Sequence, residues 1–203
     1  MTTQLTHTFS AQAHTYAVRK PMQLSFGSEP YCQEILFHAL QTIDKSAEMQ
    51  WLPEYNEVAR WMSNSRGKGL FLTGDCGRGK TNLIAFALPY IFQHFACFKG
   101  QRSAKILQSV HIDELHQELQ KGMLKKAFYV VDEVGAEAVE SVYGSKYYPF
   151  MKLMNKAEAE LKLCFFSSNL NSHQLAEKYD VRTVERISRL CKVVQFKGAS
   201  LRI

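Results

Sequence analysis

The sequence GLFLTGDCGRGKT, which spans Gly69–Thr81, decides the fold. Its apolar start, Leu70–Thr73, is typical of a buried strand, and Gly74–Thr81 then fits the pattern G-x-x-x-x-G-K-[ST] at the point where a helix begins. Glycines let the backbone curl so that successive N–H groups point inward, where the start of the next helix adds its partial positive charge. The stretch therefore predicts a phosphate-binding loop. The alternative, a glycine-rich turn with a lysine nearby, does not explain why a strand precedes the loop and a helix follows it.

Two side chains at the end of this loop carry the expected chemistry. We expect the ammonium group of Lys80 to bind the outer phosphates of a nucleotide and the hydroxyl of Thr81 to ligate Mg²⁺. The loop therefore predicts ATP and Mg²⁺ as cofactors. The residues expected to contact the nucleotide here are Gly74, Asp75, Cys76, Gly77, Arg78, Gly79, Lys80, Thr81 and Asn82.

A second predicted strand ends in two acids. Ala127–Asp132 is a nearly continuous apolar run, which is typical of a strand buried in a parallel sheet, and the carboxyl ends of such strands are where open α/β sheets bind their ligands. We expect Asp132 to hold Mg²⁺ through water and Glu133 to orient and deprotonate an attacking water. The alternative is a surface acid pair after a core strand, which the phosphate-binding loop upstream disfavours.

Two later segments add polar groups that fit a phosphate site. Leu163–Asn169 is an apolar strand with a polar end, and the amide of Asn169 offers donors and an acceptor to a phosphate or a water. Asn after a strand also commonly forms a turn. In the helix predicted over Val181–Leu190, Arg182 and Arg186 share one face. They belong either to a basic solvated face or to an arginine finger that reaches the nucleotide of a neighbouring subunit.

Strands and helices alternate along the chain after Gly69. The predicted strands are Leu70–Thr73, Ile106–Ser109, Ala127–Asp132, Leu163–Ser168 and Val193–Phe196. The predicted helices are Tyr31–Lys45, Pro53–Ser63, Lys80–Phe98 with a kink or an end at Pro89, Ile112–Leu124, Lys146–Glu160, Ser172–Tyr179 and Val181–Leu190. This order predicts an α/β fold with a parallel sheet, right-handed crossovers and helices on both faces.

The composition is that of a globular protein in a reducing compartment. Hydrophobic residues make up 46% and charged residues 22% of the chain, close to the globular average. No apolar stretch is long enough to span a bilayer, the N-terminus has no secretory signal, and the five cysteines form no C-x-x-C pair. We therefore expect a cytoplasmic protein without a membrane partner, disulfides or a zinc site. The net charge of +6 fits nucleic-acid binding and equally a basic solvated surface.

With these segments in order, the chain resembles the AAA+ ATPases of the DnaC and IstB type, which are bacterial helicase loaders and transposition helpers. The resemblance covers roughly residues 51–203. The stretches behind it are GLFLTGDCGRGKT (Gly69–Thr81), AFYVVDEVGAE (Ala127–Glu137), FFSSNLN (Phe165–Asn171), the spacing of Tyr179, Arg182 and Arg186, and GASLR (Gly198–Arg202). The SSNL string and the Y-x-x-R-x-x-x-R-[IL] run are more particular to this group than the first two motifs.

The resemblance implies a P-loop NTPase with the AAA+ core, a five-stranded sheet of order 5-1-4-3-2 counted along the chain, and no separate helical lid. That order places the strand before Asn169 between the phosphate-loop strand and the Asp132 strand, which makes Asn169 the sensor residue. It also implies that Arg186 is the trans-acting finger and that Arg202 is a second phosphate-side or interface arginine. The chain then divides into residues 1–50, an N-terminal arm and helix expected to bind a partner, and residues 51–203, the ATPase domain.

The same resemblance implies three partners: a replicative helicase or transposase, further copies of this chain in an ATP-dependent homo-oligomer, and single-stranded DNA. Residues 144–156 interleave lysines with aromatic rings, and Lys146, Tyr147 and Tyr148 are the expected DNA contacts. The alternative is that Tyr148 packs on the sheet. The chain departs from the group in having only about fifty residues before the match, and in reading Asn155–Ala157 where the group has an Arg-Tyr pair.

Three functions of different class remain open at this point. The first is an oligomeric DNA-associated ATPase that loads or remodels another protein in DNA replication or mobile-element transactions. The second is a nucleotide-binding interaction protein with little turnover, and the third is a P-loop kinase. No arginine-bearing lid or acceptor pocket of a kinase is evident, and Glu133 favours water as the nucleophile.

Overall fold

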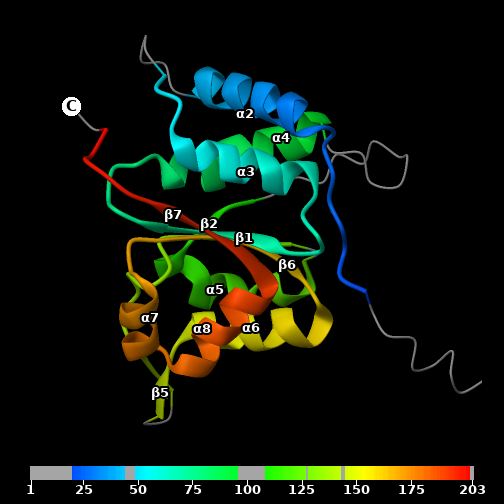
Figure 1. The fold of residues 1–203 in the computed structure, drawn as a ribbon. Coiled ribbons are helices and arrows are strands. Elements are labelled where there is room, and N and C mark those ends of the chain that lie inside the picture. The colour runs from blue at the N-terminus through cyan, green and yellow to red at the C-terminus, as the bar shows by residue number, and fades with distance from the viewer. Residues whose placement is uncertain (1–19, 44–48, 96–107, 127, 143–144, 202–203) are drawn as a thin grey trace, which may run out of the picture.

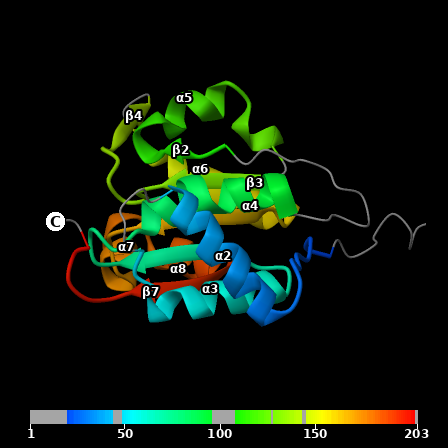
Figure 2. The same cartoon turned by 90° about the horizontal axis from the view of Figure 1, so that it is seen from above.

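The protein has three layers, a parallel sheet between two layers of helices (Figure 1). The computed structural model describes residues 20–43, 49–95, 108–126, 128–142 and 145–201, without the side chains of residue 95 and of residues 140–147. One face of the sheet is covered by α2 (Glu29–Ile43), α3 (Pro53–Ser63) and α4 (Leu88–Phe95), and the other by α5 (Leu115–Gln120), α6 (Pro149–Glu160), α7 (Ser172–Lys178) and α8 (Val181–Leu190). Figure 2 shows α2 lying across α3 and α4. No helix of the described residues is long and apolar enough to cross a membrane.

The sheet has the predicted strand order. Its strands are β1 (Gly69–Gly74), β2 (Val110–His111), β3 (Phe128–Asp132), β6 (Leu163–Ser168) and β7 (Cys191–Phe196). They lie side by side as β2-β3-β6-β1-β7, and every neighbouring pair is parallel. Counted along the chain from the other edge this is 5-1-4-3-2, which confirms the predicted architecture. The carboxyl ends of β1, β6 and β3 therefore meet at one edge of the sheet, where ligands bind in folds of this kind.

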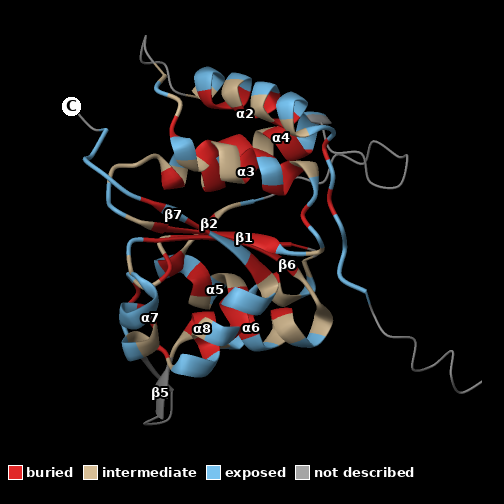
Figure 3. Cartoon of the chain, viewed as in Figure 1, coloured by how far each residue is buried: buried red, intermediate tan, exposed pale blue. Residues whose placement is uncertain are grey.

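Two hydrophobic clusters, one on each face, hold the layers together. β1 is a largely buried strand (Figure 3). Its side chains alternate between the clusters, with Leu70 and Leu72 in the cluster that includes α2 and α3 and Phe71 in the cluster that includes α6. Leu24 and the buried face of α2 belong to the first cluster, although they precede residue 50. The boundary at residue 50 and a partner-binding role for residues 1–50 stay predictions.

The helix after the phosphate-binding loop has an unusual first part. The sequence predicts one helix over Lys80–Phe98, whereas Asn82–Ala87 forms a π-helix that leads into α4, and residues 96–98 lie outside the described residues. The N–H of Leu88 bonds to the carbonyl of Leu83, five residues back. Pro89 has no N–H and its ring would collide with the carbonyl four residues earlier, so a wider turn before it relieves the conflict and the helix does not end there.

Two segments differ from the sequence-based expectation because their strands are very short. The second strand is Val110–His111 and not Ile106–Ser109, of which residues 106 and 107 lie outside the described residues. A hairpin of β4 (Glu140–Val142) and β5 (Ser145–Tyr147) occupies the start of the helix predicted over Lys146–Glu160. The helix begins at Pro149 because proline favours the first turn and disfavours a helical residue before it.

Candidate nucleotide-binding site

The loop Gly74–Thr81 connects β1 to the helix and carries the backbone geometry that a phosphate needs. Gly74 has φ 121° and Gly77 has φ 73°, conformations that residues with a Cβ rarely adopt. At Gly74 a Cβ would also lie 1.9 Å from the carbonyl oxygen of Phe196 on the neighbouring strand β7. Gly74 is therefore required by the turn and by the close approach of β7, and Gly77 by its backbone conformation.

Lys80 holds the loop from the inside. Its side chain is buried, and Nζ donates to the carbonyl oxygens of Gly74 at 2.9 Å and Asp75 at 2.7 Å. Burial lowers the pKa of the Lys80 ammonium below its usual value of 10.5, and the nearby Cys76, Asp75, Asp132 and Glu133 oppose that shift. A cation that is partly desolvated and bound only to neutral carbonyls is well placed to exchange them for phosphate oxygens.

Thr81 and Asp132 converge from two elements. The Thr81 hydroxyl, at the start of the helix, lies 3.3 Å from Oδ1 of Asp132 at the end of β3. Ser167 of β6 also donates its hydroxyl to the same carboxylate oxygen. A hydroxyl and a carboxylate are hard oxygen ligands that suit Mg²⁺, which keeps several waters and takes phosphate oxygens as further ligands. The described residues contain no cluster of three acid, histidine or cysteine ligands.

Glu133 follows Asp132 in a constrained backbone conformation. Its φ is 60°, and its N–H donates to the hydroxyl of Ser167 at 3.0 Å, which fixes the turn after β3. Its carboxylate Oε2 lies 3.2 Å from Nε2 of His111 at the end of β2. This contact could not be predicted from the sequence, because the pairing of His111 with Asp132 depends on the register of a two-residue strand.

Solved structures share this architecture. The crystal structure of DnaI is 22% identical over 81% of this chain and 94% of that chain, with a TM-score of 0.56. The crystal structure of the DnaC helicase loader is 17% identical over 78% of this chain and 98% of that chain, with a TM-score of 0.52. The chain therefore shares the fold of DnaI and of the DnaC helicase loader. The resemblance seen in the sequence is thereby confirmed at the level of the fold. No family model matches the sequence, and no curated protein does.

Asn169, the predicted sensor residue, follows the central strand of the sheet. It comes directly after β6, between β1 and β3, and its side chain is exposed at the same edge as the phosphate-binding loop. The turn that carries it is fixed because the Thr73 hydroxyl donates to the carbonyl of Leu170 at 2.6 Å. Contact of Asn169 with a phosphate or a water stays a prediction.

Arg186, the predicted arginine finger, is engaged within its own chain. Its side chain is only 8% exposed, and Nε donates to Oε2 of Glu158 on α6 at 2.7 Å. Arg189 binds the other oxygen of the same carboxylate at 2.9 Å, whereas Arg182 is exposed. The hydrogen bond from Arg186, with the charges of the three arginines, lowers the pKa of Glu158 below its usual value of 4.5. A role of Arg186 in trans therefore requires that it leave Glu158.

The predicted DNA contacts fall into two groups. Lys146 and Tyr147 belong to β5 of the hairpin, and their side chains lie outside the described structure. Tyr148 precedes α6, and its ring packs edge-on against Tyr179 at 5.3 Å between centroids, with Lys178 Nζ 5.7 Å from its centre. Tyr148 therefore has a packing role whether or not it contacts DNA. Arg202 lies outside the described residues.

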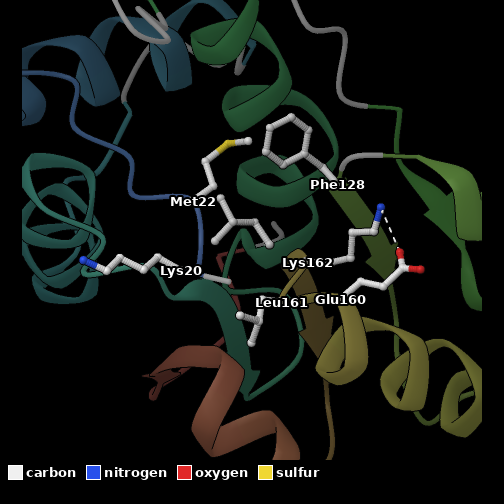
Figure 4. A pocket seen from close by; sticks show the side chains of 7 residues that line it. Lys20, Met22, Phe128, Glu160, Leu161 and Lys162 are labelled. Carbon is white, nitrogen blue, oxygen red and sulfur yellow. Dashed lines mark ion pairs between the residues drawn. The ribbon is translucent and has the colours of Figure 1, made fainter. Parts of the chain in front are cut away.

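A cavity of about 300 Å³ lies away from the phosphate-binding loop, at the amino ends of β3 and β6 (Figure 4). It is lined by Lys20, Met22, Phe128, Glu160, Leu161, Lys162 and Leu163. Lys162 and Glu160 pair with each other across 3.2 Å. None of the residues predicted to bind nucleotide lines this cavity, so it is separate from the candidate site.

Proposed function

We propose that this chain is a Mg²⁺-dependent ATPase that uses nucleotide binding and hydrolysis to act on a protein partner in DNA replication or mobile-element transactions. The observation that carries the proposal is the convergence of Lys80, Thr81 with Asp132, and Glu133 at the carboxyl edge of the sheet. A lysine for phosphate, a ligand pair for Mg²⁺ and a carboxylate one residue further match the requirements of phosphoryl transfer to water.

Each residue has a distinct task in this proposal. Lys80 releases the carbonyls of Gly74 and Asp75 and binds the outer phosphates, while the N–H groups of the loop bind the remaining phosphate oxygens. Thr81 and Asp132 would hold Mg²⁺, which when bound neutralises negative charge on the phosphates. Glu133 orients a water and accepts its proton, for which it must turn its carboxylate from His111 toward the terminal phosphate.

The proposal of a protein partner rests on the fold. One similar structure is a helicase loader, and the same fold together with the candidate nucleotide site supports the hypothesis of a related task here. A replicative helicase or a transposase is the proposed partner, with an ATP-dependent homo-oligomer as the working form. Single-stranded DNA is the proposed stimulus of hydrolysis.

Hydrolysis measured with and without single-stranded DNA tests this function. We expect the chain to bind MgATP, to release phosphate, and to do so faster when DNA is present. Saturable ATP binding with no phosphate release, with or without DNA and at every protein concentration, would instead identify a nucleotide-binding interaction protein.

That second function is favoured by one observation. Arg186 is bound to Glu158, so a chain that keeps this pair does not offer Arg186 to the nucleotide of a neighbour. Slow turnover that does not rise with protein concentration would support this second function.

A further inference from the structure

The chain after β7 returns to the phosphate-binding loop. Residues 197–201 turn at Gly198, which has φ 117°, and run across the outer side of Gly74–Thr81 (Figure 1, red). We call residues 197–201 the tail segment. It contributes none of the groups described above for the nucleotide.

Three hydrogen bonds join the tail segment to three different residues of the loop. The bonds are Gly198 N–H to Asp75 Oδ2 at 2.9 Å, Arg78 Nη1 to the carbonyl of Ala199 at 3.1 Å, and Leu201 N–H to the carbonyl of Gly77 at 2.9 Å. All three use side chains or carbonyls of the loop and none uses its N–H groups. The groups that bind phosphate are therefore left available while the loop is held from outside.

The packing at Gly77 is equally close. A Cβ on Gly77 would lie 2.1 Å from Oγ of Ser200, so only glycine lets the tail segment lie directly on the loop backbone. Gly77 thus serves two purposes. It adopts a positive φ for the phosphate turn, and it leaves room for the tail segment on the opposite side.

The side chain of Arg78 lies between the loop, the tail segment and α3. Its side chain is only 11% exposed, and besides the bond to Ala199 its Nη2 lies 3.9 Å from Oε1 of Glu54 on α3. Glu54 in turn accepts the N–H of Lys197 at 3.0 Å. The guanidinium therefore links the loop, the tail segment and α3.

We infer that the tail segment is a clamp that holds the phosphate-binding loop in its binding shape, and that Asp75 and Arg78 are positioning residues that act through the tail segment. The inference rests on the proposed nucleotide binding. A glycine-rich loop loses much conformational freedom when it closes on a phosphate, so a loop held beforehand binds more tightly. Because coupling is reciprocal, nucleotide binding stabilises the tail segment by the same factor.

Two full-length variants break the clamp at different atoms. Leu201→Pro removes the N–H that bonds to Gly77, and Arg78→Met removes the guanidinium but keeps an apolar stem. Each should weaken MgATP and MgADP binding alike, by about three- to tenfold, which is the usual range for one lost hydrogen bond. The control Leu201→Ala keeps the N–H and should stay within about twofold of wild type. If Arg78 instead contacted the terminal phosphate, Arg78→Met would weaken ATP and leave ADP binding intact, which would overturn its positioning role.

Hydrogen exchange of the loop without nucleotide gives an independent readout. Amides of residues 74–81 should exchange several-fold faster in Leu201→Pro and Arg78→Met than in wild type or Leu201→Ala. Unchanged exchange in both variants would overturn the clamp. The same measurement remains decisive if the wild-type chain binds no nucleotide, in which case the proposed function fails and the clamp is still tested.

A variant of Arg202 distinguishes a clamp from a segment that only positions Arg202, which is the next residue after the tail segment. In an Arg202→Ala background, Leu201→Pro should still weaken nucleotide binding by about three- to tenfold. If the effect of Leu201→Pro disappears in that background, the tail segment acts only by delivering Arg202, and the clamp is contradicted.

Discussion

At the scale of single residues, the side chains of the candidate site are held by hydrogen bonds to other groups of the protein. These groups occupy positions where we expect the phosphates, metal and water of a bound nucleotide. Lys80 binds two carbonyls of its own loop, and Asp132 accepts hydroxyl groups from Thr81 and Ser167. Glu133 keeps a left-handed backbone conformation with the help of Ser167 and contacts His111. These contacts satisfy buried polar groups before a nucleotide arrives, and each can be exchanged for a phosphate, a metal or a water.

The first prediction concerns Lys80. Lys80→Ala should weaken MgATP binding by more than about tenfold, because the outer phosphates lose the lysine that lies inside the loop. Isothermal titration of ATP into both proteins measures the change. Lys68→Ala is the matched control, since Lys68 also donates to a backbone carbonyl, that of Ser188, but lies at the other end of β1. Equal affinities of wild type and Lys80→Ala would show that the loop does not bind phosphate.

The second prediction concerns the metal. Thr81→Val removes a hydroxyl with little change in shape, so Mg²⁺ should no longer increase ATP affinity and hydrolysis should fall at least about tenfold. Titrations of ATP with Mg²⁺ and with a chelator measure this dependence in both proteins. Thr81→Ser keeps the hydroxyl and should retain most of the Mg²⁺ dependence. A Thr81→Val chain that responds to Mg²⁺ as wild type does would exclude Thr81 as a ligand.

At the scale of elements, α6 and α8 decide what Arg186 can do. Glu158 of α6 binds Arg186 and Arg189 of α8 through its two oxygens. The sequence predicted that Arg182 and Arg186 share one helix face but did not indicate Glu158, because Arg186 and Glu158 are 28 residues apart and meet only when the helices pack. A subunit interface would have to compete with this internal pair.

The third prediction tests Arg186 in trans. Arg186→Ala should keep ATP binding within about threefold and lose most hydrolysis, since a finger acts on the transition state of a neighbouring site. Mixed with Glu133→Gln, it should regain part of the activity at interfaces that join an intact Glu133 to an intact Arg186. Phosphate release in the mixture, compared with each variant alone, is the measurement. No recovery at any ratio, together with normal hydrolysis by a strictly monomeric chain, would rule out the finger.

The elements that the sequence predicted well are those with strong local signals. The bounds of α3 and α8 match the prediction, because Pro53 marks the start of one helix and the other carries a regular apolar face. The hairpin β4–β5 and the strand β2 were missed or misplaced, since strands of two or three residues carry too little periodicity to detect. The π-helix after the loop was not expected either, although Pro89 pointed to a local distortion.

At the scale of the whole molecule, the strand order explains why distant motifs form one site. The motifs at Lys80, Asp132 and Asn169 lie on β1, β3 and β6 or just after them, and β6 lies between the other two. Alternation of strands and helices predicted a parallel sheet, and resemblance supplied its order. The contact of His111 with Glu133 and the return of the tail segment to the loop could not be predicted, since both depend on non-local packing of short segments.

The fourth prediction concerns single-stranded DNA. Lys146→Ala should weaken ATP-dependent binding and reduce the salt slope by about 0.7 for one lost phosphate contact. Tyr147→Ala should cost ~1–3 kcal/mol if a base stacks on its ring. Fluorescence anisotropy of a labelled oligonucleotide at several salt concentrations measures both. Tyr148→Phe keeps the ring that packs on Tyr179 and serves as a control for folding. Wild-type affinity in both variants would mean that the hairpin does not contact DNA.

The central claim is that the protein binds ATP at Gly74–Thr81 and hydrolyses it with Glu133. Glu133→Gln tests it most directly, because the amide keeps the size and polarity of the side chain but cannot accept the proton of water. We predict that this variant binds MgATP with an affinity within about threefold of wild type, while phosphate release falls by ~10²–10⁴-fold. Equal turnover of Glu133→Gln and wild type in a single-turnover assay would contradict the account.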